Sequence, residues 1–147
     1  NLIQQYQADI FVIGSDSDRD AVQTTVDFTD GPVANLARRL SIDETGALCE
    51  QAALYIGNDS GLSHLAAAVG TPTITIFGPT DPTFYRPLGP RSLICAPKSS
   101  AGTRRRGDLR GTRGSDASSE DISTVSVEEV MNACAEVLGS PDATRAS

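Results

Sequence analysis

The chain has 147 residues, of which 39% are hydrophobic, and a net charge of −7 at neutral pH. This length suits a single ordinary domain that buries enough apolar surface to fold without a metal or a disulfide. The composition excludes a wholly disordered chain, a collagen and a coiled coil, and no apolar run reaches the ~20 residues of a membrane helix. The acidic balance argues against general nucleic-acid binding, because affinity for a duplex comes mostly from cations on phosphates.

The first residues contain neither a methionine nor the basic and then apolar pattern of a signal peptide, so we expect the sequence to begin within a longer protein. Residues 98–113 hold six basic side chains against Asp108 alone, a local net charge of +5. This run favours a solvated linker, and the alternative is attraction to anionic lipid at the cytoplasmic membrane face. The three cysteines fit no metal-site spacing and no disulfide framework, which indicates reduced, mostly buried thiols in a cytoplasmic protein.

Short apolar runs alternate with amphipathic segments of about ten residues along the chain. The pattern predicts strands at 9–14, 33–36, 53–57, 73–77 and 92–96, and helices at 16–28, 41–52, 61–69 and 126–138. Ser41 and Ser126 are each followed three residues later by Glu, which is the capping-box signature of a helix start. The alternation indicates an α/β fold with a doubly wound parallel sheet.

We expect four regions along the chain. They are a Rossmann-like core over 1–97, a flexible Arg/Ser/Gly-rich loop over 98–125, a C-terminal helix over 126–138 and a disordered tail over 139–147.

The loop after the third predicted strand contains Asp59, Ser60 and Gly61, followed by a helix with His64 one turn later. The first N–H groups of a helix have no partner within it and form a ready site for a phosphate or diphosphate. Gly61 would let a phosphate approach the backbone, while Ser60 and His64 would add donors. The alternative is a purely structural role, as an ordinary capped helix packed on a sheet. In that case the Asp59 carboxylate caps the helix instead of accepting bonds from sugar hydroxyls.

Two further loops follow strands at the same edge of the predicted sheet. Either Thr80 or Asp81 caps a short helical turn, or the Gly- and Pro-rich loop around them forms the wall of a binding site. Asp16 and Asp18 follow the first strand, where an acid often binds ribose hydroxyls, although a solvated helix start explains them equally well.

The stretch 53–82 closely resembles glycosyltransferase family 9, the family of ADP-heptose:lipopolysaccharide heptosyltransferases. It carries the motifs Asp-Ser-Gly-x-x-His-Leu-x-Ala-Ala, x-Gly-x-Pro and Phe-Gly-Pro-Thr-Asp-Pro in the family's order and spacing. The resemblance implies a GT-B enzyme with two Rossmann-like domains, of which this chain is the larger part of the C-terminal, donor-binding one, without its first strand. That strand, and the N-terminal domain with the acceptor site and the catalytic base, are expected before Asn1, so the resemblance places no catalytic residue in the chain.

The resemblance also implies roles for individual residues. Ser60, Gly61 and Leu62 would contact the donor diphosphate with His64 beside it, and Asp59 would bind sugar hydroxyls. Asp18 would bind the ribose, where the family usually has Glu, and Leu40 would offer its backbone to the adenine. It implies a nucleotide-sugar donor, a lipopolysaccharide-type acceptor, no cofactor and no protein-bound metal.

Two alternatives to a transferase remain open at this point. One is a non-catalytic nucleotide-binding fragment or pseudo-transferase, and the other is a GT-B-like nucleotide-sugar epimerase, which also carries an Asp-Ser-Gly turn. The combination of His64 with Gly78, Pro79 and Thr80 favours family 9 over the epimerase.

Overall fold

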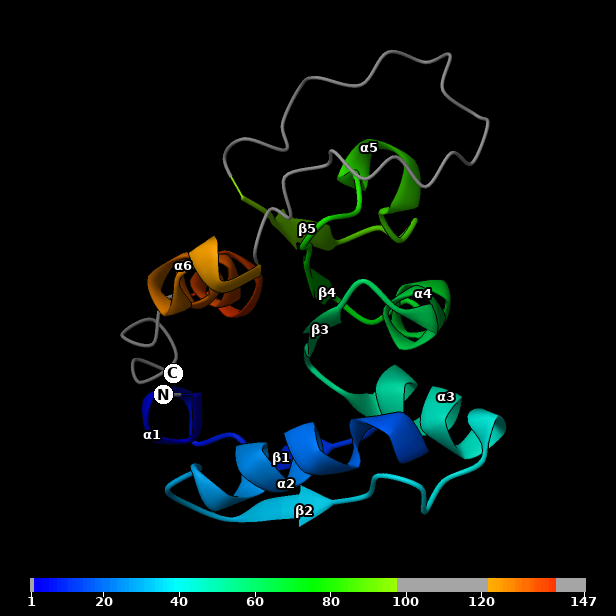
Figure 1. Cartoon of the computed structure of the whole chain (residues 1–147), viewed down its shortest axis with the longest axis vertical. Helices are drawn as coiled ribbons and strands as arrows, with labels where there is room; N and C mark the ends of the chain where they lie inside the picture. The colour runs from blue at the N-terminus through cyan, green and yellow to red at the C-terminus, as the bar shows by residue number, and fades with distance from the viewer. Residues whose placement is uncertain (1, 98–121, 140–147) are drawn as a thin grey trace. The chain divides into compact units, whose positions relative to one another are not determined.

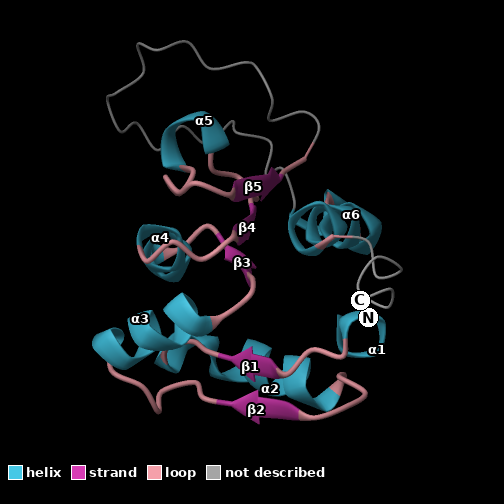
Figure 2. Cartoon of the chain, turned by 180° about the vertical axis from the view of Figure 1, so that it is seen from behind, coloured by secondary structure: helices cyan, strands magenta, loops and turns pink. Residues whose placement is uncertain are grey.

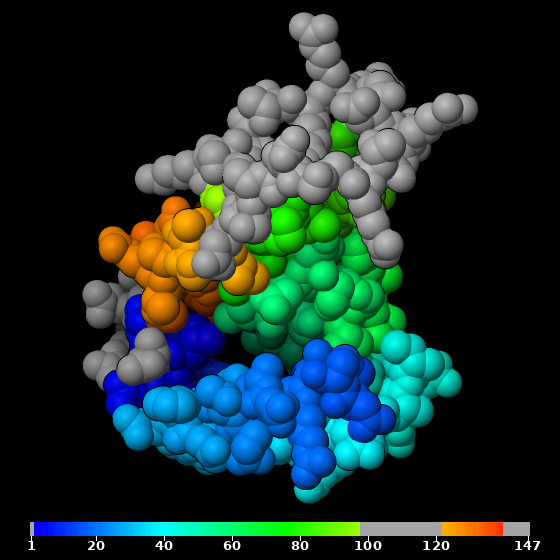
Figure 3. All heavy atoms as spheres, viewed as in Figure 1, coloured from blue at the N-terminus to red at the C-terminus, as the bar shows by residue number. Residues whose placement is uncertain are grey.

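The computed structural model describes residues 2–97 and 122–139, and Figures 1 and 3 draw the remaining residues in grey. The predictions for the loop over 98–121 and for the tail from residue 140 lie outside the described residues. Contacts divide the chain into two compact units, which meet in the sequence between Leu48 and Cys49. The predicted domain boundaries stay predictions.

The first unit is built on two short parallel strands, β1 (Ile10–Val12) and β2 (Val33–Asn35), with Ile10 opposite Val33. It also contains α1 (Leu2–Tyr6), the 3-10 turn η1 (Asp16–Asp18), α2 (Arg19–Asp27) and the start of α3 (Ile42–Gln51), whose later residues belong to the second unit. The strands predicted at 9–14 and 33–36 and the helix predicted at 16–28 are confirmed, and Val22 of α2 is buried. The turn between α2 and β2 contains Gly31 at φ +136°, a conformation that side-chain-bearing residues rarely adopt.

Two features of the first unit differ from expectation. The five-residue helix α1 was not predicted, because Leu2–Tyr6 is too short to show helical periodicity. The continuous apolar run of 9–14 predicts a strand buried on both faces, and this is wrong for Phe11 of β1, which is 51% exposed. Successive side chains of a strand point to opposite faces, and the face of this two-stranded sheet that carries Phe11 stays open to solvent.

The second unit contains a three-stranded sheet of β3 (Tyr55–Asn58), β4 (Thr73–Ile76) and β5 (Ser92–Cys95), all parallel, with β4 in the middle. Helix α4 (Gly61–Ala68) packs against β3 and β4, and α6 (Val127–Leu138) packs against β4 and β5 on the opposite side of the sheet (Figures 1 and 2). The unit also includes the short helix α5 (Pro82–Tyr85) and the 3-10 turn η2 (Ile122–Thr124). Helices on both faces of a parallel sheet confirm the doubly wound α/β class.

The core of the second unit surrounds β4. Ile74 on this strand and Phe77 just after it are fully buried, and Ala66 of α4 and Cys134 of α6 are also fully buried. A central parallel strand is covered on both faces, and 73–77 suits this position because every residue in it is β-branched or aromatic. The element was therefore predicted almost to the residue.

Both predicted capping boxes are present. The Ser41 hydroxyl accepts a bond from the Glu44 N–H (3.2 Å), while the Glu44 carboxylate accepts one from the Ser41 N–H (2.8 Å). Ser126 and Glu129 make the same reciprocal pair at the start of α6, at 3.1 and 2.9 Å. These bonds satisfy donors that the helix itself leaves without partners.

In the part of the chain that the structure describes, β1 pairs with β2 alone and β3 pairs with β4 alone. Each of these strands therefore has one side without a neighbouring strand among the described residues. No helix among the described residues is both long enough and apolar enough to cross a membrane.

Candidate functional site

The loop between β3 and α4 is fastened to the carboxyl ends of two neighbouring strands. Ser63, which is fully buried, donates its hydroxyl to the Asn58 carbonyl at 2.5 Å. The Asp59 N–H donates to the Ile76 carbonyl at the end of β4, at 3.2 Å. These two bonds hold Asp59, Ser60 and Gly61 at the edge of the sheet where ligands of doubly wound folds bind.

The N-terminus of α4 is open. Ser60 is the N-cap residue, with φ −155° and ψ 168°, yet its side chain makes no capping bond. The N–H groups of Gly61 and Leu62 precede the first intrahelical bond and have no acceptor among the described residues. A Cβ built on Gly61 would meet nothing within 4 Å. The exposed Ser60 hydroxyl and two N–H groups are thus available to an anion that approaches Gly61.

The side chains beside this N-terminus include Asp59, Leu62 and His64. Asp59 does not cap α4, since Ser60 occupies the N-cap position, and its half-buried carboxylate has no partner among the described residues. His64 is exposed and lies one helical turn after Ser60, while Leu62 is half-buried. Of the two readings of Asp59, helix capping is therefore absent, and the carboxylate stays available to hydroxyl groups.

The loop after β4 contains the other two predicted residues of this unit. Asp81 is the N-cap of α5, and its carboxylate accepts a bond from the Thr83 N–H at 2.8 Å. Pro82 occupies the first turn, where its missing N–H costs nothing. The predicted cap is thus confirmed, and the half-buried Thr80 precedes it. A role of either residue in substrate binding stays a prediction.

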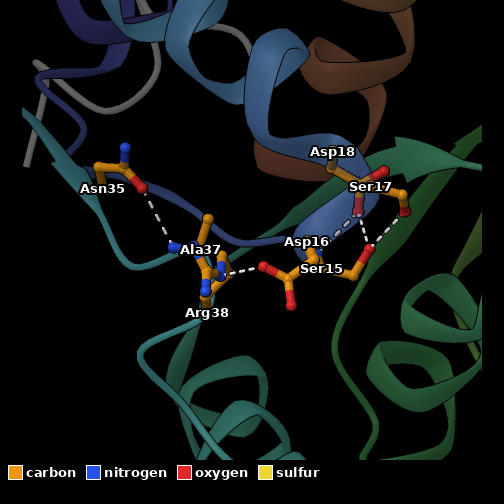
Figure 4. A network of polar contacts seen from close by, with 7 residues as sticks. All are labelled: Ser15, Asp16, Ser17, Asp18, Asn35, Ala37 and Arg38. Carbon is orange, nitrogen blue, oxygen red and sulfur yellow. Dashed lines mark hydrogen bonds and ion pairs between the residues drawn. The ribbon is translucent and has the colours of Figure 1, made fainter.

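In the first unit, Asp18 folds back on the loop after β1 (Figure 4). Its carboxylate accepts bonds from the Ser15 hydroxyl (2.6 Å) and the Ser15 N–H (2.7 Å), and these two bonds lower the pKa of Asp18. Close approach at Gly14 makes this possible, since a Cβ there would lie 3.1 Å from the Asp18 Cβ. Asp18 is exposed and ionised at neutral pH, as a ribose-binding carboxylate must be.

The loop after β2 is joined to the loop after β1 (Figure 4). The Arg38 N–H donates to the Gly14 carbonyl at 3.1 Å, and the Arg38 guanidinium forms an ion pair with Asp16. The Asn35 side chain accepts a bond from the Ala37 N–H at 3.1 Å, which tightens the turn. Leu40, half-buried, lies at the end of this loop, just before the Ser41 cap. The sequence analysis missed Ser15, Asn35 and Arg38, and only Asn35, a turn-forming residue at the end of β2, gives a signal.

Neither a metal centre nor a reactive thiol is found in the part of the chain that the structure describes. No group of three or more His, Cys, Asp or Glu side chains there could hold a metal ion. Cys49, Cys95 and Cys134 are free and buried, as predicted, and burial raises the pKa of each thiol. A nucleophilic cysteine needs the opposite shift, because the thiolate is the reactive form.

The predicted residues therefore fall into two sets, each at the carboxyl ends of parallel strands. Asp18 and Leu40 belong to the first unit, and the second holds Asp59, Ser60, Gly61, Leu62, His64, Thr80 and Asp81. The second set offers donors for an anion beside a carboxylate, and the first offers a carboxylate and backbone groups. The individual roles of these residues stay predictions.

Curated relatives of this chain are lipopolysaccharide heptosyltransferases. A segment of 80 residues is 42% identical to lipopolysaccharide heptosyltransferase 3 of Escherichia coli, covering 52% of this chain and 24% of that protein. A segment of 99 residues is 32% identical to lipopolysaccharide heptosyltransferase 2 of E. coli K12, covering 67% of this chain and 28% of that protein. The matched segments thus span about a quarter of the length of these two relatives.

Two solved structures share the fold at 22% sequence identity and a TM-score of 0.70. One is a family 9 glycosyltransferase from Veillonella parvula, with 91% of this chain and 37% of that chain covered. The other is E. coli ADP-heptose lps heptosyltransferase II, with 93% and 39% covered. The family profile described as glycosyltransferase family 9 (heptosyltransferase) matches residues 1–111, which is most of the sequence. Since this match covers 111 of the 147 residues, the chain belongs to glycosyltransferase family 9.

Proposed function

We propose that this chain is the donor-binding part of a transferase that moves a heptose, or a related sugar, from a nucleotide diphosphate to a lipopolysaccharide-core-type acceptor. The observation that carries the proposal is the open N-terminus of α4, where Ser60, Gly61 and Leu62 present unused donors. Family membership and the names of the relatives support the reaction class. No observation favours the epimerase or the non-catalytic fragment.

The chemistry of this site would be stabilisation of a leaving diphosphate. As the bond from the sugar to the diphosphate breaks, negative charge develops on the phosphate oxygens. Backbone N–H groups at a helix N-terminus stabilise that charge without reorganising, and the helix dipole adds to their effect. His64 would supply a further donor, and Asp59 would accept bonds from sugar hydroxyls, so the proposal needs no cofactor and no protein-bound metal.

The remaining groups would bind the nucleoside and bound the site. Asp18 would accept bonds from the ribose hydroxyls, and the backbone of Leu40 would bind the adenine. Thr80 and Asp81 would form the wall of the site on the β4 side. The base that deprotonates the acceptor hydroxyl would come from an N-terminal domain. The two solved structures are long enough to contain such a domain, since this chain covers only 37% and 39% of them.

We propose a cytoplasmic location. For the basic residues of 98–113, peripheral contact with the inner face of the membrane is the alternative to the solvated linker that their composition favours. Each Lys or Arg near an anionic surface contributes about 1 kcal/mol, and salt weakens this attraction. Co-sedimentation with anionic liposomes at low and high salt tests the contact. Binding at low salt that high salt abolishes would support it, and no binding at low salt would exclude it.

The donor site is tested by Gly61→Val. Because a Cβ at Gly61 meets nothing within 4 Å, the variant should fold and melt like the wild type. Its branched side chain would nevertheless keep a diphosphate away from the N–H groups, so ADP binding measured by calorimetry should be lost. Ala68→Val is the matched control, since it adds the same branch at an exposed position of the far end of α4 and should leave ADP binding unchanged.

Two results would contradict the proposal. One is wild-type affinity for ADP in Gly61→Val, which would mean that α4 does not bind the diphosphate. The other is a wild-type chain that binds no ADP, which would remove the donor-binding role itself.

A further inference from the structure

Arg38 has an unusual backbone for an arginine. Its φ is 64°, and among the described residues only Gln7 shares a positive φ without being glycine. The left-handed region disfavours side chains with a Cβ, so such a residue persists only where surrounding bonds fix it. Residues with such a backbone conformation are enriched at binding sites, so the contacts that fix Arg38 indicate what it could do.

Two contacts with the neighbouring loop hold Arg38 in place. Its N–H donates to the Gly14 carbonyl at 3.1 Å, and its Nε pairs with the Asp16 carboxylate. The Arg38 and Asp16 side chains are 55% and 80% exposed. An ion pair so open to water adds little to folding stability, so stability alone is a weak reason for the arrangement.

The position of the pair suggests a different role. Asp16 lies two residues before Asp18, and Arg38 lies two residues before Leu40. The ion pair and the bond to Gly14 therefore join the loop that carries Asp18 to the loop that ends at Leu40 (Figure 4). A nucleoside that contacts both loops needs them at a fixed separation.

We propose that Arg38 is a positioning residue for the nucleoside half of a nucleoside diphosphate, acting through Asp16 and Gly14 on the spacing of Asp18 and Leu40. This role rests on the proposed donor-binding function. It predicts a selective effect: loss of the ion pair between Arg38 and Asp16 weakens binding of the nucleoside but leaves the diphosphate contacts at α4 unchanged. A purely structural role would weaken both or neither.

The test compares Arg38→Gly with Arg39→Gly on the 147-residue chain. Glycine adopts a positive φ freely, so Arg38→Gly removes the ion pair while relieving the backbone, and its melting temperature should not fall. Arg39 is an exposed neighbour of the same charge in the same turn, with no ion pair among the described residues. Calorimetry with ADP and with inorganic pyrophosphate then separates the two halves of the ligand.

We expect Arg38→Gly to weaken ADP binding roughly two- to fivefold, the range of a surface ion pair. Its affinity for pyrophosphate should match that of the wild type, and Arg39→Gly should match the wild type for both ligands. Asp16→Asn should weaken ADP binding by the same factor, and the double variant Asp16→Asn/Arg38→Gly should weaken it no further, because both changes remove one interaction.

Unchanged ADP affinity in Arg38→Gly, or an equal loss for ADP and pyrophosphate, would overturn the positioning role and leave the proposed function standing. A wild-type chain that binds no ADP, or binds ADP but not pyrophosphate, would overturn the proposed donor site and the role of Arg38 with it.

Discussion

Two threonines on the central strand of the second unit predict opposite effects of the same substitution. Thr73 and Thr75 are both 0% exposed, and because they are two residues apart their side chains point to the same face of β4. The Thr73 hydroxyl donates to the Thr71 carbonyl at 2.9 Å. The Thr75 hydroxyl is buried with no hydrogen-bond partner among the described residues.

The magnitudes follow from that difference. A buried hydroxyl without a partner costs about 1–3 kcal/mol, and valine replaces it with a methyl group of similar shape. Thr75→Val should therefore raise the free energy of unfolding by about 1 kcal/mol. Thr73→Val removes a hydrogen bond worth about 1 kcal/mol and should lower the free energy of unfolding by at least that amount.

Urea unfolding followed by far-UV circular dichroism measures both variants against the wild type. In thermal melts each kcal/mol corresponds to a shift of about 2–4 °C for a chain of this size. If Thr75→Val destabilised the protein as much as Thr73→Val, the Thr75 hydroxyl would have to possess a partner in solution. The assignment of a buried, unpaired hydroxyl to Thr75 would then be wrong.

Three further predictions concern the helix caps and the activity of the chain. Ser126→Ala removes the hydroxyl that accepts the Glu129 N–H and should cost about 1 kcal/mol in urea unfolding, whereas a change near zero would mean that α6 does not depend on its cap. Hydrogen bonds from the backbone and then the side chain of Ser41 lower the pKa of Glu44, so the folded state favours the ionised form. The stabilisation that these hydrogen bonds contribute is complete above the ordinary pKa of 4.5, and it is lost as the pH falls through the lowered pKa of the folded state. Urea midpoints measured across this pH range should therefore fall less for Ser41→Ala than for the wild type. The 147-residue chain incubated with ADP-heptose and a lipid-A-core acceptor should give no product by mass spectrometry, and turnover near 1 per second would place the catalytic group within these residues.

Much of the fold could be predicted because local sequence signals agreed with the tertiary environment. The run Thr73–Ile76 is β-branched and lies in the middle of a sheet, so propensity and burial favour the same structure. Ser41 and Ser126 formed the expected capping boxes because all the atoms of that motif come from four consecutive residues. β3 begins two residues later than predicted, at Tyr55, because pairing with Thr73 and not the apolar run from Ala53 decides where the strand starts.

The candidate site was less predictable from sequence. A serine before a helix favours a capping bond, yet the Ser60 hydroxyl makes none, and only the structure reveals that this donor is unused. Nothing in the residues around Arg38 indicates a positive φ, since that conformation depends on Gly14 and Asp16, more than twenty residues earlier. Contacts between distant loops have no local signature, whereas the motifs of the Asp59 loop do.

The two bonds that brace the loop before α4 also have a thermodynamic consequence. Ser63 to Asn58 and Asp59 to Ile76 order this loop in the folded protein before any ligand arrives. A flexible loop would lose conformational entropy on binding, and that loss would offset part of the attraction for a diphosphate. Here the loss is already part of the folding free energy. The preorganised donors at α4 can therefore give a larger share of their interaction energy to affinity.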